Sequence, residues 1–400
     1  MLNVSSLRGV LMKPVLMALL FVLASLAGCV QSEETTTPDV EAIFDYSPRN
    51  DIRVGDTIEF DASASLPQGG SLTYQWDFDN DGSYDESGRT TTWEYSSAGS
   101  KTVKLAVKDG TTTAYQTRDL TVAAADAAEP IANAGSHSPF SDCDSKSVSS
   151  GNYYIYYICE MDKSLSSKSV SATTTVNLDG SDSESGDSND YISEWNWDLD
   201  LQRDTDGDGN YKNDADLTGE QVEWKDVEPG EYKISLTVIN GQGLTETDET
   251  IVYVNYVGRW NDFSIGGNNS NNAVEIEFDY TAVNDNIAGN TIRRSIGELV
   301  YPKEDSDCTN IPGTNNCRAK LDIYGYNEEG EHVANTSSTG PDQRGGADCD
   351  DDTDCVSLQF TGSYHYSESY WDDGEWMYVI QNDKINDLDI ESFTIRLIYK

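Results

Sequence analysis

After its first forty residues the chain consists of short segments in which apolar and polar residues alternate. "TIEFDAS" from residue 57 and "KTVKLAVKDG" from residue 101 show this period of two, and Gly, Asn, Asp and Ser separate such segments. Alternation places one face of a strand in a core and the other in water. No stretch after the leader keeps a long helical period. The pattern therefore predicts an all-β chain.

The alternating pattern contains an internal repeat. "DTIEFDASAS", "YQWDFDNDG" and "KTVKLAVKDG" of the first copy return as "TTVNLDGSDS", "EWNWDLD" and "YKISLTVINGQG" of the second. In both copies a strand ends in a Ser-rich turn, a Trp-Asp strand follows, and a last strand ends in an Asp-Gly or Asn-Gly turn. The repeat predicts two successive domains of one kind.

These motifs resemble the polycystic kidney disease (PKD) domain, an immunoglobulin-like β-sandwich of surface proteins. "YSPRNDIRVGDTIEFDASAS", "WDFDNDG" and "YSSAGSKTVKLAV" carry the first match, and "PIANAG", "VNLDGSDS", "WNWDLD" and "EPGEYKISLTV" carry the second. The second copy departs from the pattern by an insertion at about 136–168. We expect this insertion to be a disulfide-closed hairpin. The resemblance implies tandem sandwiches that serve as spacers and interaction modules.

Residues 257–400 resemble no family, but their segments alternate in the same way, as in "NAVEIEFDYTAV" and "ESFTIRLIYK". They predict a third β-sandwich. The expected segments are a lipoprotein signal peptide at 1–28, a polar tether at 29–40, a PKD-like sandwich at 41–124, a second at 125–256 and the C-terminal sandwich at 257–400.

The first thirty residues predict export. Arg8 and Lys13 precede an apolar run that is short for a membrane span, and "LAGC" resembles the lipobox of exported lipoproteins. The resemblance implies lipidation of Cys29 and a cell-envelope or cell-surface location, with the lipid as the only membrane anchor. An ordinary signal peptide with an incidental cysteine is the alternative.

Charge and cysteine content fit an extracellular protein. The formal net charge of −45 repels nucleic acid and anionic lipid, so neither is an expected partner, whereas divalent cations are. Of the seven cysteines, six remain once Cys29 is set aside, and outside the cell disulfides persist. They fall in three close pairs, which favours neighbour pairing: Cys143 with Cys159, Cys308 with Cys317, and Cys349 with Cys355.

A ladder of carboxylates follows Trp76 in the first copy. Residues two apart share a face of a strand, so the rings of Tyr74, Trp76 and Phe78 are expected in the core. The opposite, outward face then carries Gln75, Asp77, Asp79 and Asp81. Like charges at about 4 Å repel by roughly 1 kcal/mol in water, so such a row favours a bound cation.

Calcium is the expected cation because it takes several carboxylate and carbonyl oxygens. The acids match the first half of a calcium loop, but the position of the usual bidentate glutamate holds Gly88 in the first copy and Ala215 in the second. The candidate metal ligands are Asp77, Asp79, Asp81 and Asp85 in the first copy and Asp204, Asp206 and Asp208 in the second.

Two other interpretations of the acids stay open. Asp and Asn in turns often accept hydrogen bonds from their own backbone, and acids abound in this chain. The acidic loop "CDDDTDC" at 349–355 is interpreted as a solvated turn. A catalytic carboxylate pair is not indicated, since among 71 acids some pair meets any distance criterion.

The stretch "SYHYSESYWDDGEWMYV" at 363–379 is rich in rings. Flat apolar ring faces suit sugars, and packing within the domain is the alternative. The candidate ligand-binding residues are Tyr364, Tyr366, Trp371 and Trp376, with Tyr370 nearby.

Together the patterns predict a non-enzymatic, lipid-anchored surface protein for adhesion or capture of an extracellular protein or glycan, with calcium as the candidate cofactor that stiffens it. An accessory carbohydrate- or protein-binding component of a secreted hydrolase system is the alternative. A hydrolase in residues 257–400 is a further one.

Overall fold

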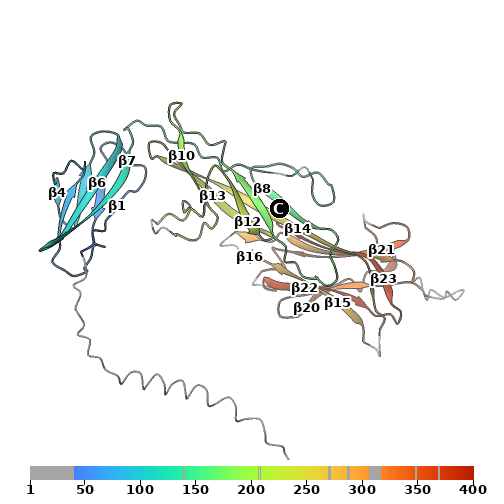
Figure 1. Ribbon diagram of the computed structural model, residues 1–400. Helices are drawn as coiled ribbons and strands as arrows, with labels where there is room; N and C mark the ends of the chain where they lie inside the picture. Colours follow the sequence, from blue (N-terminus) through green and yellow to red (C-terminus); the bar gives the residue numbers. More distant parts are fainter. Residues whose placement is uncertain are drawn as a thin grey trace, which may run out of the picture. The chain divides into compact units, whose positions relative to one another are not determined.

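The computed structural model describes residues 40–400, apart from 138, 140, 206, 208, 269–271, 286–288, 306–316, 347–348 and 368–369. This part of the chain is built almost entirely of strands, with a short 3-10 helix, η1, at Pro341–Gln343, which confirms the predicted all-β class (Figure 1). It contains no helix long and apolar enough to cross a membrane. The chain forms two compact units. One contains residues up to Ser47 with Glu59–Trp93 and Thr102–Asp119, and the other contains Pro48–Ile58, Glu94–Lys101 and Leu120–Lys400.

The first repeat forms two antiparallel sheets with strand orders β1-β2-β5 and β4-β3-β6-β7. Phe44, Phe60, Trp76 and Phe78 are buried as the alternation predicts, and their rings form one cluster. The strands are β1 (Asp45–Ser47), β2 (Thr57–Asp61), β3 (Thr73–Asp77), β4 (Glu86–Ser87), β5 (Thr90–Glu94), β6 (Gly99–Asp109) and β7 (Thr112–Val122).

The second repeat has a similar strand pattern, with two strands rather than three in its smaller sheet. A two-stranded sheet pairs β9 with β12, and the larger sheet has the order β11-β10-β13-β14. Trp197 in β10 is fully buried, as is Trp76 in β3. The strands are β9 (Thr174–Asp179), β10 (Ile192–Asp198), β11 (Leu217–Thr218), β12 (Gln221–Val227), β13 (Gly230–Asn240) and β14 (Thr245–Ile265).

The C-terminal residues form the predicted third sandwich. One layer continues from β14 through β23, β18 and β21, and the other has the order β15-β22-β19-β20. The strands are β15 (Val274–Ala282), β16 (Asn284–Asp285), β17 (Asn290–Thr291), β18 (Arg294–Pro302), β19 (Asp322–Tyr326), β20 (His332–Asn335), β21 (Thr353–Thr361), β22 (Gly374–Asn382) and β23 (Leu388–Ile398).

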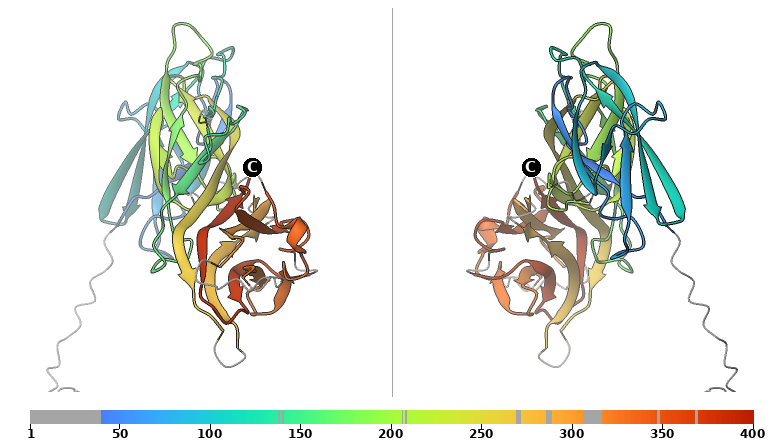
Figure 2. Two further views of the ribbon diagram at one scale, coloured as in Figure 1. Left: turned by 90° about the vertical axis from the view of Figure 1, so that its right-hand side faces the viewer. Right: turned by 90° about the vertical axis from the view of Figure 1, so that its left-hand side faces the viewer.

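Strand β14 belongs to both the second repeat and the C-terminal sandwich. Its first half pairs with β13 and its second half, from Tyr256, pairs with β23. Figure 2 shows β14 in yellow beside the red β23. The expected boundary between residues 256 and 257 therefore falls inside one strand.

The insertion of the second repeat does not form the expected hairpin. Its apolar run forms β8 (Tyr154–Glu160), which pairs in parallel with residues 252–258 of β14. This pairing spans the point where β14 changes partner from β13 to β23. The predicted disulfide Cys143–Cys159 closes the insertion, and Asp144 beside it forms ion pairs with Arg259 and Arg396. The insertion thus contacts β14 on both sides of the point where the second repeat meets the C-terminal sandwich.

Candidate functional site

The acidic turn of the first repeat lies at the end of β3. Asp77 accepts hydrogen bonds from the backbone N–H groups of Asp81, at 3.1 Å, and Gly82, at 3.0 Å. Asp79 accepts one from Asp81, and Asp85 accepts one from Phe78 at 2.8 Å. One oxygen each of Asp77, Asp79 and Asp85 lies within 4.8 Å of the others, a spacing that one cation could bridge.

The expectation that Asp77 faces water was wrong. Its side chain is 1% exposed, because β3 ends at this residue and the turn folds back over the carboxylate. The two backbone donors replace the water that a buried carboxylate loses. Asp79, Asp81 and Asp85 are exposed, and Asp81 accepts a hydrogen bond from Ser83 N–H, outside the group of three.

The second repeat has an equivalent acid set that the calcium-loop spacing missed. Asp198 follows the buried Trp197 as Asp77 follows Trp76, and Asp216 accepts a hydrogen bond from Leu199 N–H as Asp85 does from Phe78. The indole N–H of Trp197 donates to Gly219, matching the bond from Trp76 to Gly88. The shared signal in the sequence is "DESG" at 85–88 and "DLTG" at 216–219.

The predicted metal ligand Asp204 has a local role. Its two carboxylate oxygens accept backbone N–H groups of Gly207 and Gly209, so it closes its own loop as an Asx-type turn. Asp206 and Asp208 lie outside the described residues. The acids that lie with Asp198 are instead Asp200, Asp214 and Asp216, whose charges raise its pKa.

The carboxylate of Asp198 is buried and has a raised pKa. It is 1% exposed, and burial raises its pKa to about 6. The hydrogen bond from Asp200 N–H to its Oδ1, at 2.9 Å, opposes this rise, whereas the charges of Asp216, Asp214 and Asp200 add to it. Such a shift marks a group whose charge is poorly compensated by its surroundings.

The third acidic loop is a local turn. The predicted disulfide Cys349–Cys355 closes it, and Asp350 accepts hydrogen bonds from Asp352 N–H and the Thr353 hydroxyl, both at 2.9 Å. Asp350, Asp351 and Asp352 are exposed. Cys317 is disulfide-bonded, and its predicted partner Cys308 lies outside the described residues.

The ring-rich stretch divides between core and surface. Tyr366 and Trp376, predicted to bind ligand, are each 1% exposed, so that interpretation was wrong for them. The Tyr366 hydroxyl lies in a buried cluster with Ser295, at 2.6 Å, and Tyr280, at 3.0 Å. The Trp376 indole N–H donates to Asp372. The alternation of β22 and the packing of the turn before it place these two rings between the sheets.

The other rings gather at the surface. Tyr364 is 46% exposed, Tyr370 is 56% exposed and Trp371 is half-buried. Ring centroids lie 4.3 Å apart for Tyr364 and Tyr370 and 6.2 Å apart for Tyr364 and Trp371. His365 stacks on Trp371 at 5.8 Å, and burial lowers the pKa of His365, whose Nδ1 accepts a hydrogen bond from Thr361 N–H. His365 thus supports the ring cluster Tyr364, Tyr370 and Trp371 by stacking on Trp371.

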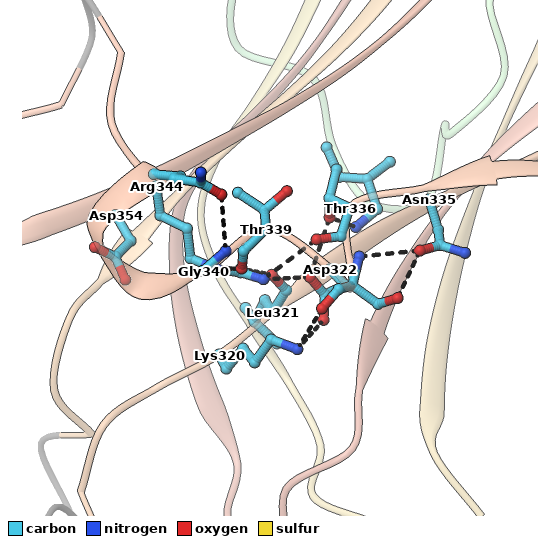
Figure 3. A network of polar contacts seen from close by, with 12 residues as sticks. Lys320, Leu321, Asp322, Asn335, Thr336, Thr339, Gly340, Arg344 and Asp354 are labelled. Carbon is cyan, nitrogen blue, oxygen red and sulfur yellow. Dashed lines mark hydrogen bonds and ion pairs between the residues drawn. The ribbon is translucent and has the colours of Figure 1, made fainter.

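A buried ion pair fixes the segment before β21 (Figure 3). The Arg344 guanidinium donates to Asp322 at 2.5 Å, to Leu321 O at 2.6 Å and to Tyr301 at 2.7 Å. Thr336 adds a bond to the same Asp322 oxygen. These partners satisfy the charges of both Arg344 and Asp322. We therefore assign the network a structural role and not a role in ligand binding.

Paired antiparallel sheets with Trp-Asp strands define the class of the first repeat as an immunoglobulin-like β-sandwich. Residues 38–124 match the family described as PKD domain, which confirms the resemblance inferred from the motifs of the first repeat. No curated protein matches the chain.

Solved structures of multi-domain β-proteins align at low identity. Fibronectin(III)-like modules of Clostridium thermocellum CbhA align at 12% identity and a TM-score of 0.26, over 54% of this chain and 95% of theirs. Three N-terminal domains of the outer capsid protein Hoc of bacteriophage RB49 align at 15% identity and a TM-score of 0.24, over 89% of this chain and 97% of theirs. Carbohydrate-binding modules of the β-sandwich superfamily align at 14% identity and a TM-score of 0.20, over 90% of this chain and 97% of theirs. Similarity at this level defines neither a family nor a ligand.

Proposed function

We propose that the chain is an exported surface protein, tethered through a lipid on Cys29, that captures an extracellular glycan with its C-terminal sandwich. The PKD match supports a spacer or binding module for the first repeat. The ring cluster Tyr364, Tyr370 and Trp371 is the observation that carries the ligand class. In this proposal the protein binds its ligand without chemical turnover.

The ring cluster has properties that suit a sugar. Of the rings in this stretch, Tyr366 and Trp376 are buried and belong to the core of the domain. Tyr364 and Tyr370 stay exposed although each contributes a large apolar face, which a solvent-facing loop has no packing reason to retain. Aromatic faces bind apolar groups of a ligand, and their polar tips keep contact with water.

The proposal is tested by glycan-array binding of the full chain and of Tyr370→Ala and Trp371→Ala. Each variant should bind its glycan about fivefold more weakly, since one ring contact contributes on the order of 1 kcal/mol and about 1.4 kcal/mol would be tenfold. The melting temperature of Tyr370→Ala should not change, because this ring is largely exposed.

Tyr191→Ala is the matched control, since Tyr191 is 66% exposed on the second repeat, outside the ring cluster. It should bind as the wild type does. Equal binding by all three variants, or no glycan bound by the wild type, would refute glycan capture. Unfolding of Trp371→Ala would assign that ring to packing and leave the decision to Tyr370→Ala.

The tether is tested separately. Expressed in a bacterial host, the full chain should fractionate with membranes and carry a lipid mass at Cys29, which lies outside the described residues. Cys29→Ala should be released in soluble form. Release of the wild type in soluble form would refute the lipid anchor, and it would not bear on glycan binding.

Calcium binding by the first acidic turn belongs to the same proposal. The close approach of the carboxylates of Asp77, Asp79 and Asp85 supports it. Backbone donors already bind all three side chains, so we expect weak affinity, about 10⁻⁴–10⁻³ M, as in other extracellular calcium modules. Loss of one calcium-binding event in Asp79→Asn would support this site.

A further inference from the structure

The second repeat buries a carboxylate oxygen that has no hydrogen-bond donor. Oδ2 of Asp198 is inaccessible to water, and no partner lies within hydrogen-bonding distance among the described residues. Its Oδ1 accepts a single bond, from Asp200 N–H at 2.9 Å. Buried polar atoms are nearly always paired, so an unpaired carboxylate oxygen indicates a missing partner.

Three further carboxylates, those of Asp200, Asp214 and Asp216, act electrostatically on Asp198. Asp216 is held by the bond from Leu199 N–H to its Oδ2, at 2.8 Å, and Asp214 by the bond from Thr205 N–H to its Oδ2, also at 2.8 Å. Asp200 accepts a bond from Gln202 N–H through Oδ1. Asp214 is buried at 3% exposure, whereas Asp200 and Asp216 are exposed. Each side chain is therefore oriented by its backbone bond.

The charges in this cluster have one sign. Among the described residues, the charged side chains that act on Asp198 are those of Asp216, Asp214 and Asp200, and all of them are acidic. Bringing a carboxylate out of water beside other carboxylates is unfavourable unless a positive charge compensates them. A bound cation would supply both the positive charge and the partner that Oδ2 lacks.

We propose that Asp198, Asp200, Asp214 and Asp216 form a divalent cation site of calcium type at the end of β10. The donors are carboxylate oxygens without nitrogen or sulfur, which suits calcium rather than a transition metal. The buried Asp198 and Asp214 would anchor the ion, and the exposed Asp200 and Asp216 would leave room for water ligands. This site differs from the loop of Asp204, Asp206 and Asp208, and it does not depend on glycan capture.

Calcium titration calorimetry of the full chain tests the site. The wild type should bind calcium, and Asp198→Asn should weaken one binding event by more than about tenfold, because even the loss of an indirect ligand contact typically weakens metal binding to that extent. Asn keeps the shape of the side chain and can still accept the bond from Asp200 N–H. Asp77→Asn monitors the first acidic turn in the same experiment.

Asp204→Asn is the matched control, since this acid lies in the same loop and, among the described residues, binds backbone N–H groups. It should bind calcium with wild-type affinity. Melting curves in a calcium chelator show that Asp198→Asn folds, and they should place its melting temperature above that of the wild type. Added calcium should raise the melting temperature of the wild type and of Asp204→Asn, with a smaller rise for Asp198→Asn.

Three outcomes would overturn the proposal: no calcium bound by the wild type at millimolar concentration, wild-type affinity and stoichiometry in Asp198→Asn, or loss of binding in Asp204→Asn with binding retained in Asp198→Asn. The last result would return the site to the loop predicted from spacing.

Discussion

The two acidic turns share a framework but differ in how they treat their buried carboxylate. In each repeat a buried tryptophan precedes the acid, and a later aspartate, Asp85 or Asp216, binds the backbone just after it. In the first repeat the short connection supplies two N–H donors to Asp77. In the second the longer connection supplies one donor to Asp198 and brings in the buried Asp214.

This difference indicates that the length of the connection decides how the buried charge is compensated. A tight turn, residues 78–84, folds its own amides onto the carboxylate. The connection 199–215 is held by Asp204, Asp214 and Asp216, which accept its amides themselves. The same position of the framework is thus closed by the backbone in the first repeat, and in the second repeat it is the position at which we propose a cation.

The largest expected effect is on the first turn. Asp77→Asn replaces one of two acceptor oxygens by an N–H₂ group facing a backbone donor, and it removes the charge from both bonds. We expect a loss of about 2 to 3 kcal/mol in the free energy of unfolding, measured by urea denaturation. An unchanged stability would mean that the turn closes without Asp77, and the contrast between the repeats would disappear.

Asp198→Asn should have the opposite sign in a calcium chelator. It removes a buried charge that has one donor and acidic neighbours, so we expect a gain of about 1 to 2 kcal/mol. The same denaturation measurement compares it with Asp77→Asn. A destabilised Asp198→Asn would indicate that its carboxylate is already compensated within the folded chain.

The stability difference between Asp198→Asn and the wild type should depend on pH. The folded pKa of Asp198 is raised to about 6, above its ordinary value of 3.8, so the folded state binds the extra proton between these limits. The wild type should therefore gain stability relative to Asp198→Asn as the pH falls from 7.5 through 6 to 4.5 without calcium. Melting curves of both proteins over this range check the sign. A difference that grows on acidification would contradict the raised pKa.

The smallest expected contrast is between Asp85→Asn and Asp216→Asn. Each removes the charge from an exposed side chain that accepts one backbone N–H at 2.8 Å. Without calcium each should cost about 1 kcal/mol, and the two losses should agree within about 0.5 kcal/mol. With calcium, Asp216→Asn should lose more of its thermal stabilisation than Asp85→Asn, because we expect the first turn to bind calcium only weakly. Unequal losses in the chelator would show that the two frameworks are not equivalent.

Much of this architecture could be predicted from alternation and repetition. The buried Trp76 and Phe78 and the third sandwich follow from a period of two. The period of two did not predict the orientation of Asp77, because the alternation ends where strand β3 ends, at this residue. The continuous β14 was also hidden, since a long strand that changes partner leaves no break in the pattern.

The second acidic site was missed for a different reason. Asp204 matches the spacing of calcium ligands, whereas Asp198 and Asp216 are far apart in sequence and meet only through pairing of β10 with β11. Comparison of "DESG" with "DLTG" in the two repeats carries that information. For the rings, alternation could not separate Tyr366 from Tyr364, because both lie in a turn rather than a strand.

The most direct measurement is a crystal structure of the full chain grown with a calcium-site lanthanide such as terbium, with anomalous scattering used to locate the ion. We expect an anomalous peak for an ion that is bound by Oδ2 of Asp198 together with oxygens of Asp214 and Asp216. A structure without a peak there, in which a backbone or side-chain donor lies within hydrogen-bonding distance of Asp198 Oδ2, would contradict it.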